Sequence, residues 1–156
     1  MIVGRPHRDL ADPLHAAGAP LRALRHLTAV RAVAYLMLAE AASLAVSSDL
    51  HISGVVTGRG APFNGTHAGI AEAIIAAVLV AGAIFMLKFP RQGRRIGIAL
   101  NAAAVVGFLN GLSMTARGGH VPDIVYHLTV LPLLIASVIV LARSRPIPDE
   151  ATAANR

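Results

Sequence analysis

The chain has 156 residues, of which 55% are hydrophobic and 14% are charged, and it contains no cysteine. Because a soluble domain normally has about 25% charged residues, this composition excludes an ordinary soluble protein and predicts a polytopic membrane protein. The absence of cysteine excludes disulfides, thiolate catalysis, iron–sulfur clusters and cysteine-based metal sites. The formal net charge of +6 does not indicate a nucleic-acid partner, because the positive residues gather at the ends of apolar segments.

Residues 1–29 are predicted to form a cytoplasmic arm. Its first 20 residues contain three prolines and no apolar period, which is typical of a loose segment. After Pro20, leucines recur at helical spacing with Arg22, Arg25 and His26 on another face, and this pattern predicts a short basic helix at the membrane surface. The long leader and the acid Glu40 inside the next apolar run favour a retained helix over a cleaved signal peptide.

Four apolar segments follow, each long enough to cross a hydrocarbon core of ~30 Å at ~1.5 Å per residue. Short connections make neighbouring segments antiparallel, so the predicted fold is all-α, a four-transmembrane-helix bundle. Its membrane domain is residues 30–142, followed by a cytoplasmic tail of residues 143–156. The predicted spans are about 30–50, 68–89, 96–116 and 123–142.

The connections and one proline refine this prediction. Residues 49–64 are rich in glycine and form the first loop, and Pro90 to Arg95 forms a short connector. Pro132 inside the last span predicts a kink near Thr129 or a lost backbone hydrogen bond.

The distribution of lysine and arginine predicts the orientation. Twelve of the 14 lie before the first span, between the second and third, or after the fourth. The other two, Arg59 and Arg117, lie in the opposite loops. By the positive-inside rule, both termini are expected in the cytoplasm. In size and span number the chain resembles small, alanine-rich four-helix membrane proteins of bacteria, so the expected location is the cytoplasmic (inner) membrane.

Spans one and three share a short pattern. Glu40 is followed three residues later by Ser43, and Asn110 is followed three residues later by Ser113. A duplicated helical hairpin with a pseudo-two-fold axis along the membrane normal would give this pattern.

Each span also offers one strongly polar residue, roughly 6 to 14 Å below the outer surface at the helical rise. An isolated ionised side chain in lipid costs about 2.5 kcal/mol or more, so these groups are expected to share the bundle interior. They predict an outward-facing polar pocket that binds a small ligand, a metal ion or a proton. The same groups are also explained as hydrogen-bonded packing contacts between helices. The predicted pocket residues are Glu40, Glu72, Asn110 and His127.

Several chemistries fit such a pocket. Imidazole and carboxylate ligands suit zinc, iron or manganese, and the predicted metal ligands are His67, Glu72, His127 and Asp123. A b-type haem would use His67 and His127, whereas a proton path would use Glu40, Glu72 and His127. His51 and His120 are interpreted as solvated loop residues.

The sequence leaves three functional classes open. The favoured one is a non-enzymatic membrane protein that binds its ligand in the polar pocket. The alternatives are a haem- or metal-dependent redox subunit and an accessory or structural subunit of a larger membrane complex. Beyond the lipid bilayer, the partners expected are further copies of the chain or that complex. Hydrolases and nucleotide enzymes have no positive support, because phosphate loops, Ser-His-Asp arrangements and HExxH are absent from the sequence.

Overall fold

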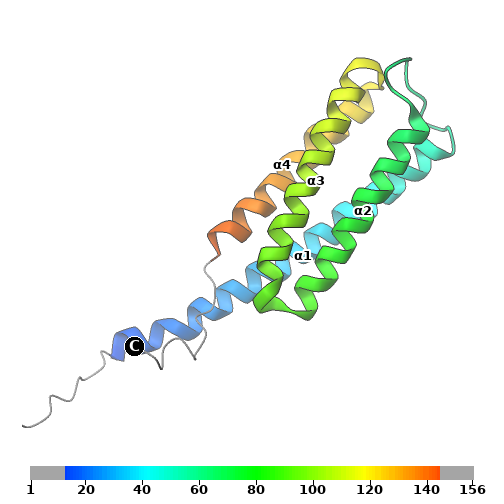
Figure 1. Ribbon diagram of the computed structural model, residues 1–156. Helices are drawn as coiled ribbons and strands as arrows, with labels where there is room; N and C mark the ends of the chain where they lie inside the picture. Colours follow the sequence, from blue (N-terminus) through cyan, green and yellow to red (C-terminus); the bar gives the residue numbers. More distant parts are fainter. Residues whose placement is uncertain (1–12, 145–156) are drawn as a thin grey trace, which may run out of the picture.

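Four antiparallel helices form an elongated bundle (Figure 1). The computed structural model describes residues 13–144, with the side chains of residues 24–144 apart from Arg91. All four helices are long and apolar enough to cross a membrane. The predicted all-α four-helix fold is therefore confirmed, and the chain is a multi-pass membrane protein. The helices are α1 (Pro13–Ile52), α2 (Gly65–Lys88), α3 (Pro90–Gly118) and α4 (Val121–Arg143).

Local sequence explains where the helices begin. Asn64 is the N-cap of α2, and its Oδ1 accepts a hydrogen bond of 3.0 Å from the backbone N–H of His67. Pro90 and Pro122 lie in the first turns of α3 and α4. A backbone N–H has no partner within the helix at this position, so proline, which lacks the N–H, loses no hydrogen bond.

The helices are longer than the predicted spans. α1 is one continuous helix of 40 residues from Pro13, in place of a loose arm, a surface helix and a separate span. The predicted connector from Pro90 to Arg95 is the beginning of α3, which leaves Phe89 as the junction with α2. Helix α4 runs unbroken through Pro132. Residues 1–12 and 145–156 of the predicted arm and tail lie outside the described residues.

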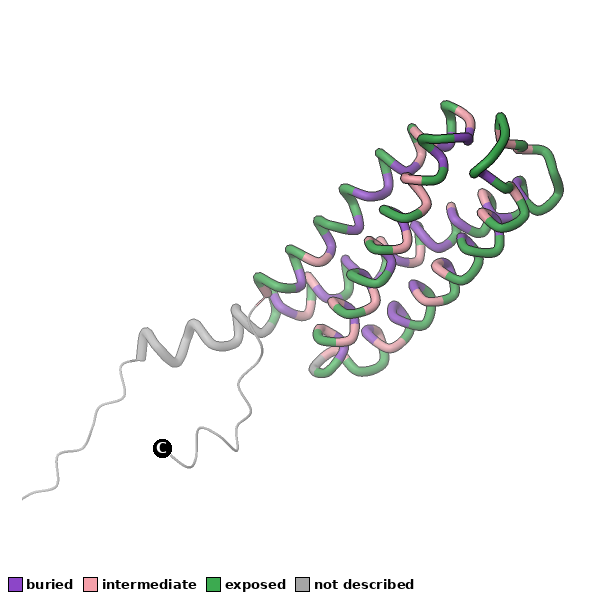
Figure 2. Tube along the Cα trace, turned by 45° about the horizontal axis from the view of Figure 1, so that its top comes forward, coloured by how far each residue is buried: buried purple, intermediate pink, exposed green. Residues whose placement is uncertain are grey.

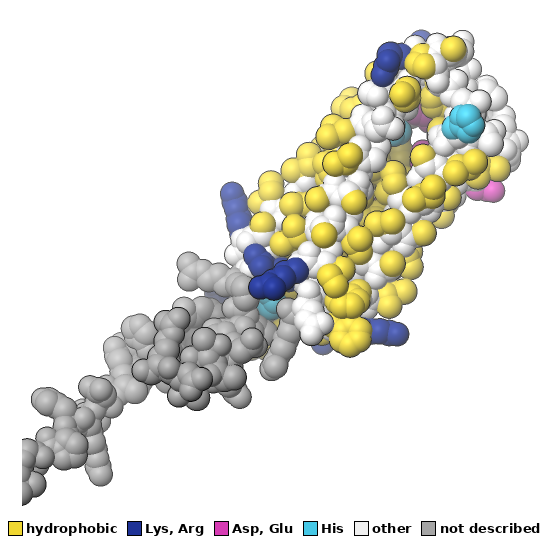
Figure 3. Space-filling model, viewed as in Figure 1, with side chains coloured by type: hydrophobic (Ala, Val, Ile, Leu, Met, Phe, Trp, Pro, Cys, Tyr) yellow, Lys and Arg dark blue, Asp and Glu magenta, His cyan; other side chains and the backbone are white. Residues whose placement is uncertain are grey.

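The core is a narrow apolar seam along the bundle axis, while the outer helix faces are exposed (Figure 2). Met37, Leu79, Phe108 and Leu134, one from each helix, are at most 2% exposed. The exposed faces carry aliphatic side chains, and Figure 3 shows them covering the visible side of the bundle. An apolar exterior of this kind suits contact with lipid.

The two ends of the bundle differ. The loop end carries residues 53–64 and the turn at Gly119 and His120, and the terminal end carries Phe89 and both ends of the described chain (Figure 1). At the terminal end the Arg94 side chain donates hydrogen bonds to the last carbonyls of α4, those of Leu141 (2.7 Å) and Ala142 (2.9 Å). Figure 3 shows most of the visible lysine and arginine side chains at this end.

Candidate functional site

Three ionisable side chains from three helices meet near the loop end. His51 of α1 places its Nδ1 2.9 Å from Oε2 of Glu72 on α2 and its Nε2 3.3 Å from Oδ2 of Asp123 on α4. The three residues are 3%, 6% and 8% exposed, respectively. This group, here called the His51 cluster, is a buried polar contact inside an apolar bundle, where ionisable side chains normally pair with one another.

Serines of α1 hold α2 in the register that the cluster needs. The Ser47 hydroxyl donates to Oε1 of Glu72 at 2.9 Å, and the Ser48 hydroxyl donates to the carbonyl of Gly69 at 2.7 Å. A Cβ atom at Gly69 would lie 2.8 Å from the Ser48 carbonyl oxygen, closer than real Cβ atoms come. Glycine therefore permits the close helix approach that brings Glu72 to His51.

The proton count of the cluster follows from its contacts. Both ring nitrogens of His51 face carboxylate oxygens, so each contact needs one proton between its two atoms. Either His51 carries both protons, or one carboxyl group carries a proton and donates it to the ring. In both arrangements the cluster has one net negative charge.

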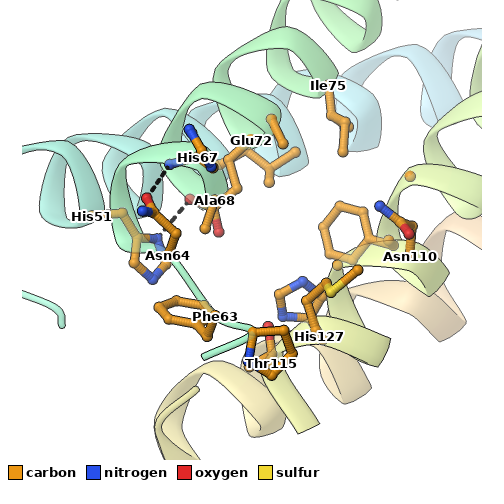
Figure 4. A pocket seen from close by; sticks show the side chains of 17 residues that line it. His51, Phe63, Asn64, His67, Ala68, Glu72, Ile75, Asn110, Thr115 and His127 are labelled. Carbon is orange, nitrogen blue, oxygen red and sulfur yellow. Dashed lines mark hydrogen bonds and ion pairs between the residues drawn. The ribbon is translucent and has the colours of Figure 1, made fainter. Parts of the chain in front are cut away.

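A cavity of about 260 Å³ lies beside the cluster, lined by residues of all four helices and the first loop. Figure 4 shows Glu72 and His51 on one side of it and His127 on another. Figure 3 shows acidic and histidine atoms recessed between the helices near the loop end. The apolar part of the lining includes Leu44, Phe63, Ile75, Phe108 and Met114.

His127 presents a hydrogen-bond acceptor at this cavity. Its Nδ1 lies 2.8 Å from the backbone carbonyl of Asp123, and because a carbonyl only accepts, Nδ1 carries the proton. In the neutral ring, Nε2 then has the free lone pair. A Cβ at Gly111 would lie 2.8 Å from Nε2, so the absence of a side chain there leaves room for the ring. Phe108 packs beside the ring at a centroid distance of 5.2 Å.

The first loop covers the cavity at the loop end. Phe63 is 9% exposed and packs against His51 with ring centroids 5.8 Å apart. The backbone N–H of Arg59 donates to the carbonyl of Gly118 on α3 at 2.6 Å. A Cβ at Gly118 would clash with the carbonyl of Gly60, so this glycine allows the loop to lie directly on α3.

The predicted site residues divide into three groups. Glu72, His127 and Asp123 are buried near the cavity. Asn110 and His67 line the cavity but are exposed, although Asn110 was expected in the interior. Glu40 is 4% exposed but does not line the cavity, so it forms a separate buried site.

His51 and Asn101 are among the buried polar residues that were missed. His51 was assigned to a solvated loop, but it lies in the last turn of α1 and joins the two acids. The signal was present, because Glu40, Ser43 and Ser47 occupy one helix face and His51 continues it by one turn. Asn101, rather than Asn110, is the fully buried amide of α3, and its Nδ2 donates to the Gly97 carbonyl at 2.9 Å.

The predicted metal and haem ligands are arranged differently from the expectation. Within the described residues, no group of three or more histidine, cysteine or acidic side chains has the geometry to hold a metal ion. His51, instead of the predicted His67, contacts both Glu72 and Asp123. For a haem, Nε2 of His127 is a suitable atom, whereas His67 is exposed at the start of α2.

A helical bundle hosts many unrelated functions, so the fold alone assigns no activity. What distinguishes this bundle is a small apolar cavity with a carboxylate and an imidazole in its wall. The chain matches no protein-family model, no curated protein and no solved structure.

Proposed function

We propose that this membrane protein binds a small organic cation, a protonated amine with an apolar body, in the cavity at the loop end. The observation that carries the proposal is the cavity wall, in which Glu72 and His127 are set among apolar side chains. Glu72 is the counter-ion, and Nε2 of His127 accepts a second hydrogen bond from the ligand. The protein acts by binding rather than by catalysing a reaction.

Charge and hydrogen-bond chemistry support a cation. The His51 cluster has one net negative charge when both of its contacts are hydrogen bonds, and a buried charge is stabilised by an opposite charge. The carboxylate of Glu72 and the free Nε2 of His127 are both acceptors, so they match a ligand that donates protons, such as an ammonium group.

The size of the cavity limits the ligand. Small-molecule pockets are commonly about 300–1,000 Å³, and this cavity of about 260 Å³ lies just below that range. Its lining includes the aromatic rings of Phe63 and Phe108, and aromatic faces attract cations. These features favour a ligand with one ring or a short branched chain.

The charge distribution supports an orientation with the cavity facing away from the cytoplasm. Arg59 in the first loop and Arg117 in the last turn of α3 are the only lysine or arginine residues near the loop end. The positive-inside rule then assigns both termini to the cytoplasm. In a bacterial cytoplasmic membrane, the cavity would take its ligand from the outer side.

Calorimetry with a charged probe and a neutral probe tests the proposal. Benzylammonium and benzyl alcohol have similar shapes, but only the first is a cation. The detergent-purified protein should bind benzylammonium more tightly, and Glu72→Gln should weaken that binding about tenfold, which corresponds to about 1.4 kcal/mol.

Asp49→Asn is the matched control, because Asp49 is an exposed acid near the same end of α1. It should leave the affinity for benzylammonium unchanged. Equal affinities for the two probes, or equal losses in Glu72→Gln and Asp49→Asn, would contradict the proposal.

A further inference from the structure

We infer that Glu40 is a separate proton-binding site in the middle of the bundle, which exchanges its proton with the loop end through the hydroxyl groups of Ser43 and Ser47. This inference concerns a different site from the ligand cavity and does not depend on the proposed ligand.

The surroundings of Glu40 favour a bound proton. The residue is 4% exposed, and neither carboxyl oxygen has a hydrogen-bond partner among the described residues. From the end of α1 at Ile52, it lies 12 residues into the helix, or ~18 Å at the helical rise. An ionised carboxylate without a partner at such a depth is far more costly than a neutral acid.

The other helices bring no positive charge to this depth. Glu40 is the only charged residue of α1 between Arg31 and Asp49, and α3 has none between Arg95 and Arg117. On α2 the only charged residue before Lys88 is the acid Glu72.

Helix α4 also brings no lysine or arginine to the depth of Glu40. On α4 the titratable groups before Arg143 are Asp123, Tyr126 and His127, all in its first two turns. Tyr126 is neutral in its ordinary form, so it supplies no positive charge that would keep Glu40 ionised. A proton is then the species that neutralises Glu40.

A line of hydroxyl groups connects Glu40 with the loop end. Ser43, Ser47 and His51 follow it at offsets of 3, 7 and 11 residues, on one face of α1. Neighbours three or four residues apart on a helix have Cβ atoms about 5–6 Å apart. At this spacing the side chains of neighbouring members can approach one another.

Each serine also has a polar partner on another helix. The Ser43 hydroxyl donates its proton to the backbone carbonyl of Glu40 at 2.8 Å. The Tyr126 hydroxyl lies 2.9 Å from the Ser43 oxygen and is therefore the donor in that contact. Ser47 donates to Glu72 of the His51 cluster at 2.9 Å. Hydroxyl groups both donate and accept protons, so this line can pass a proton between the cluster and Glu40, with each hydroxyl taking up one proton as it releases its own.

Infrared spectroscopy in H₂O and D₂O tests the inference. A protonated carboxylic acid has a C=O stretching band that is distinct from the bands of carboxylates. We expect such a band in the wild-type protein and its loss in Glu40→Gln, with an unchanged helical circular-dichroism spectrum. Glu40→Asp provides a second variant that retains an acid, so the band should shift in frequency rather than disappear.

The rate at which this band shifts in D₂O tests the route. The double variant Ser43→Ala, Ser47→Ala removes both hydroxyls and should slow the exchange about tenfold or more, because each lost relay group raises the barrier to transfer. Ser113→Ala is the matched control, since Ser113 is on α3 and makes the same local bond, to the Asn110 carbonyl at 2.8 Å.

Two results would overturn the inference. A wild-type spectrum without an acid band that depends on Glu40 would mean that this group is ionised, for example beside a bound metal cation. Exchange that is equally fast in the wild type and the double serine variant would mean that the proton reaches Glu40 by another route. Binding of benzylammonium should be unaffected by Glu40→Gln, so failure of the ligand proposal is observed separately.

Discussion

At the scale of single residues, His51 determines whether the two acids can be buried together. It touches Glu72 and Asp123 through different ring nitrogens, at 2.9 Å and 3.3 Å. Without the imidazole, two carboxyl groups would share one apolar site with no group between them. One of them would then have to take up a proton or leave the interior.

Replacing His51 by alanine should therefore lower stability strongly. Removing one partner from a buried ion pair costs about 3–5 kcal/mol, so Tm in detergent should fall clearly in His51→Ala. Combining His51→Ala with Glu72→Gln should recover part of this loss, because the variant then buries one acid fewer. Thermal unfolding followed by circular dichroism measures both effects.

His67→Ala is the control for this comparison, because His67 is exposed at the start of α2. Its effect should stay within about 0.5 kcal/mol, as for other surface substitutions. If His51→Ala changed Tm as little as His67→Ala, the cluster would not be a stabilising contact.

At the scale of helices, glycines position the polar groups as much as the polar residues do. Gly69 lets α2 approach α1 at Ser48, and Gly111 lets α3 approach the ring of His127 on α4. These approaches place Glu72 and His127 at one cavity. A bulkier helix surface would separate the helices or cover the polar atoms.

Gly111→Ala should weaken ligand binding without unfolding the bundle. The added Cβ would lie 2.8 Å from Nε2 of His127, so the ring must shift and its acceptor atom becomes covered. Alanine also favours a helix over glycine by about 1 kcal/mol, which offsets part of the strain. Calorimetry should show reduced affinity for benzylammonium with Tm close to that of the wild type.

A substitution elsewhere on α3 provides the control. Ala102→Val adds volume to α3 at an exposed position and should leave the affinity unchanged. If Gly111→Ala bound benzylammonium as tightly as this control does, Nε2 of His127 would not be part of the binding site.

Helix periodicity explains which parts of the structure were predictable. Long apolar segments identified all four helices, because a helix satisfies its backbone hydrogen bonds within the segment itself. The helix ends were less predictable, since Pro90 begins α3 although the arginines after it suggested a connector. Ending α1 at Leu50 rather than Ile52 placed His51 in a loop, and that error of two residues hid the centre of the cluster.

The direction of a side chain around its helix was not predictable. Asn110 lines the cavity and is nevertheless exposed, whereas Asn101 is fully buried. The helices are apolar on all sides, so periodicity does not show which face meets the other helices. For the same reason, Glu40 and Asn110 have the same spacing to a following serine, yet Glu40 is buried and Asn110 is exposed.

At the scale of the whole molecule, the bundle is polarised from one end to the other. The buried His51 cluster, the cavity and the covering loop lie at the loop end, while Arg94 closes the terminal end by capping α4. The proposed ligand would therefore enter the cavity from one side of the membrane. By the positive-inside rule, we expect this side to be the one opposite the termini.

Cysteine labelling tests this orientation, and the cysteine-free chain makes each introduced thiol unique. Thr57 in the first loop and Gln92 near the start of α3 are both exposed and lie at opposite ends. A membrane-impermeant maleimide should label Thr57→Cys in intact cells, and it should label Gln92→Cys only after permeabilisation. The reverse pattern would show that the cavity faces the cytoplasm.

The central claim is that a cation binds between Glu72 and His127, and the most direct measurement is NMR of protein labelled with ¹⁵N-histidine. The ring of His127 should carry its proton on Nδ1, and its Nε2 signal should move on addition of benzylammonium but not of benzyl alcohol. The same titration with Glu72→Gln should need more probe to produce the shift. A His127 signal that stays unchanged while calorimetry shows benzylammonium bound would place the ligand elsewhere and contradict the claim.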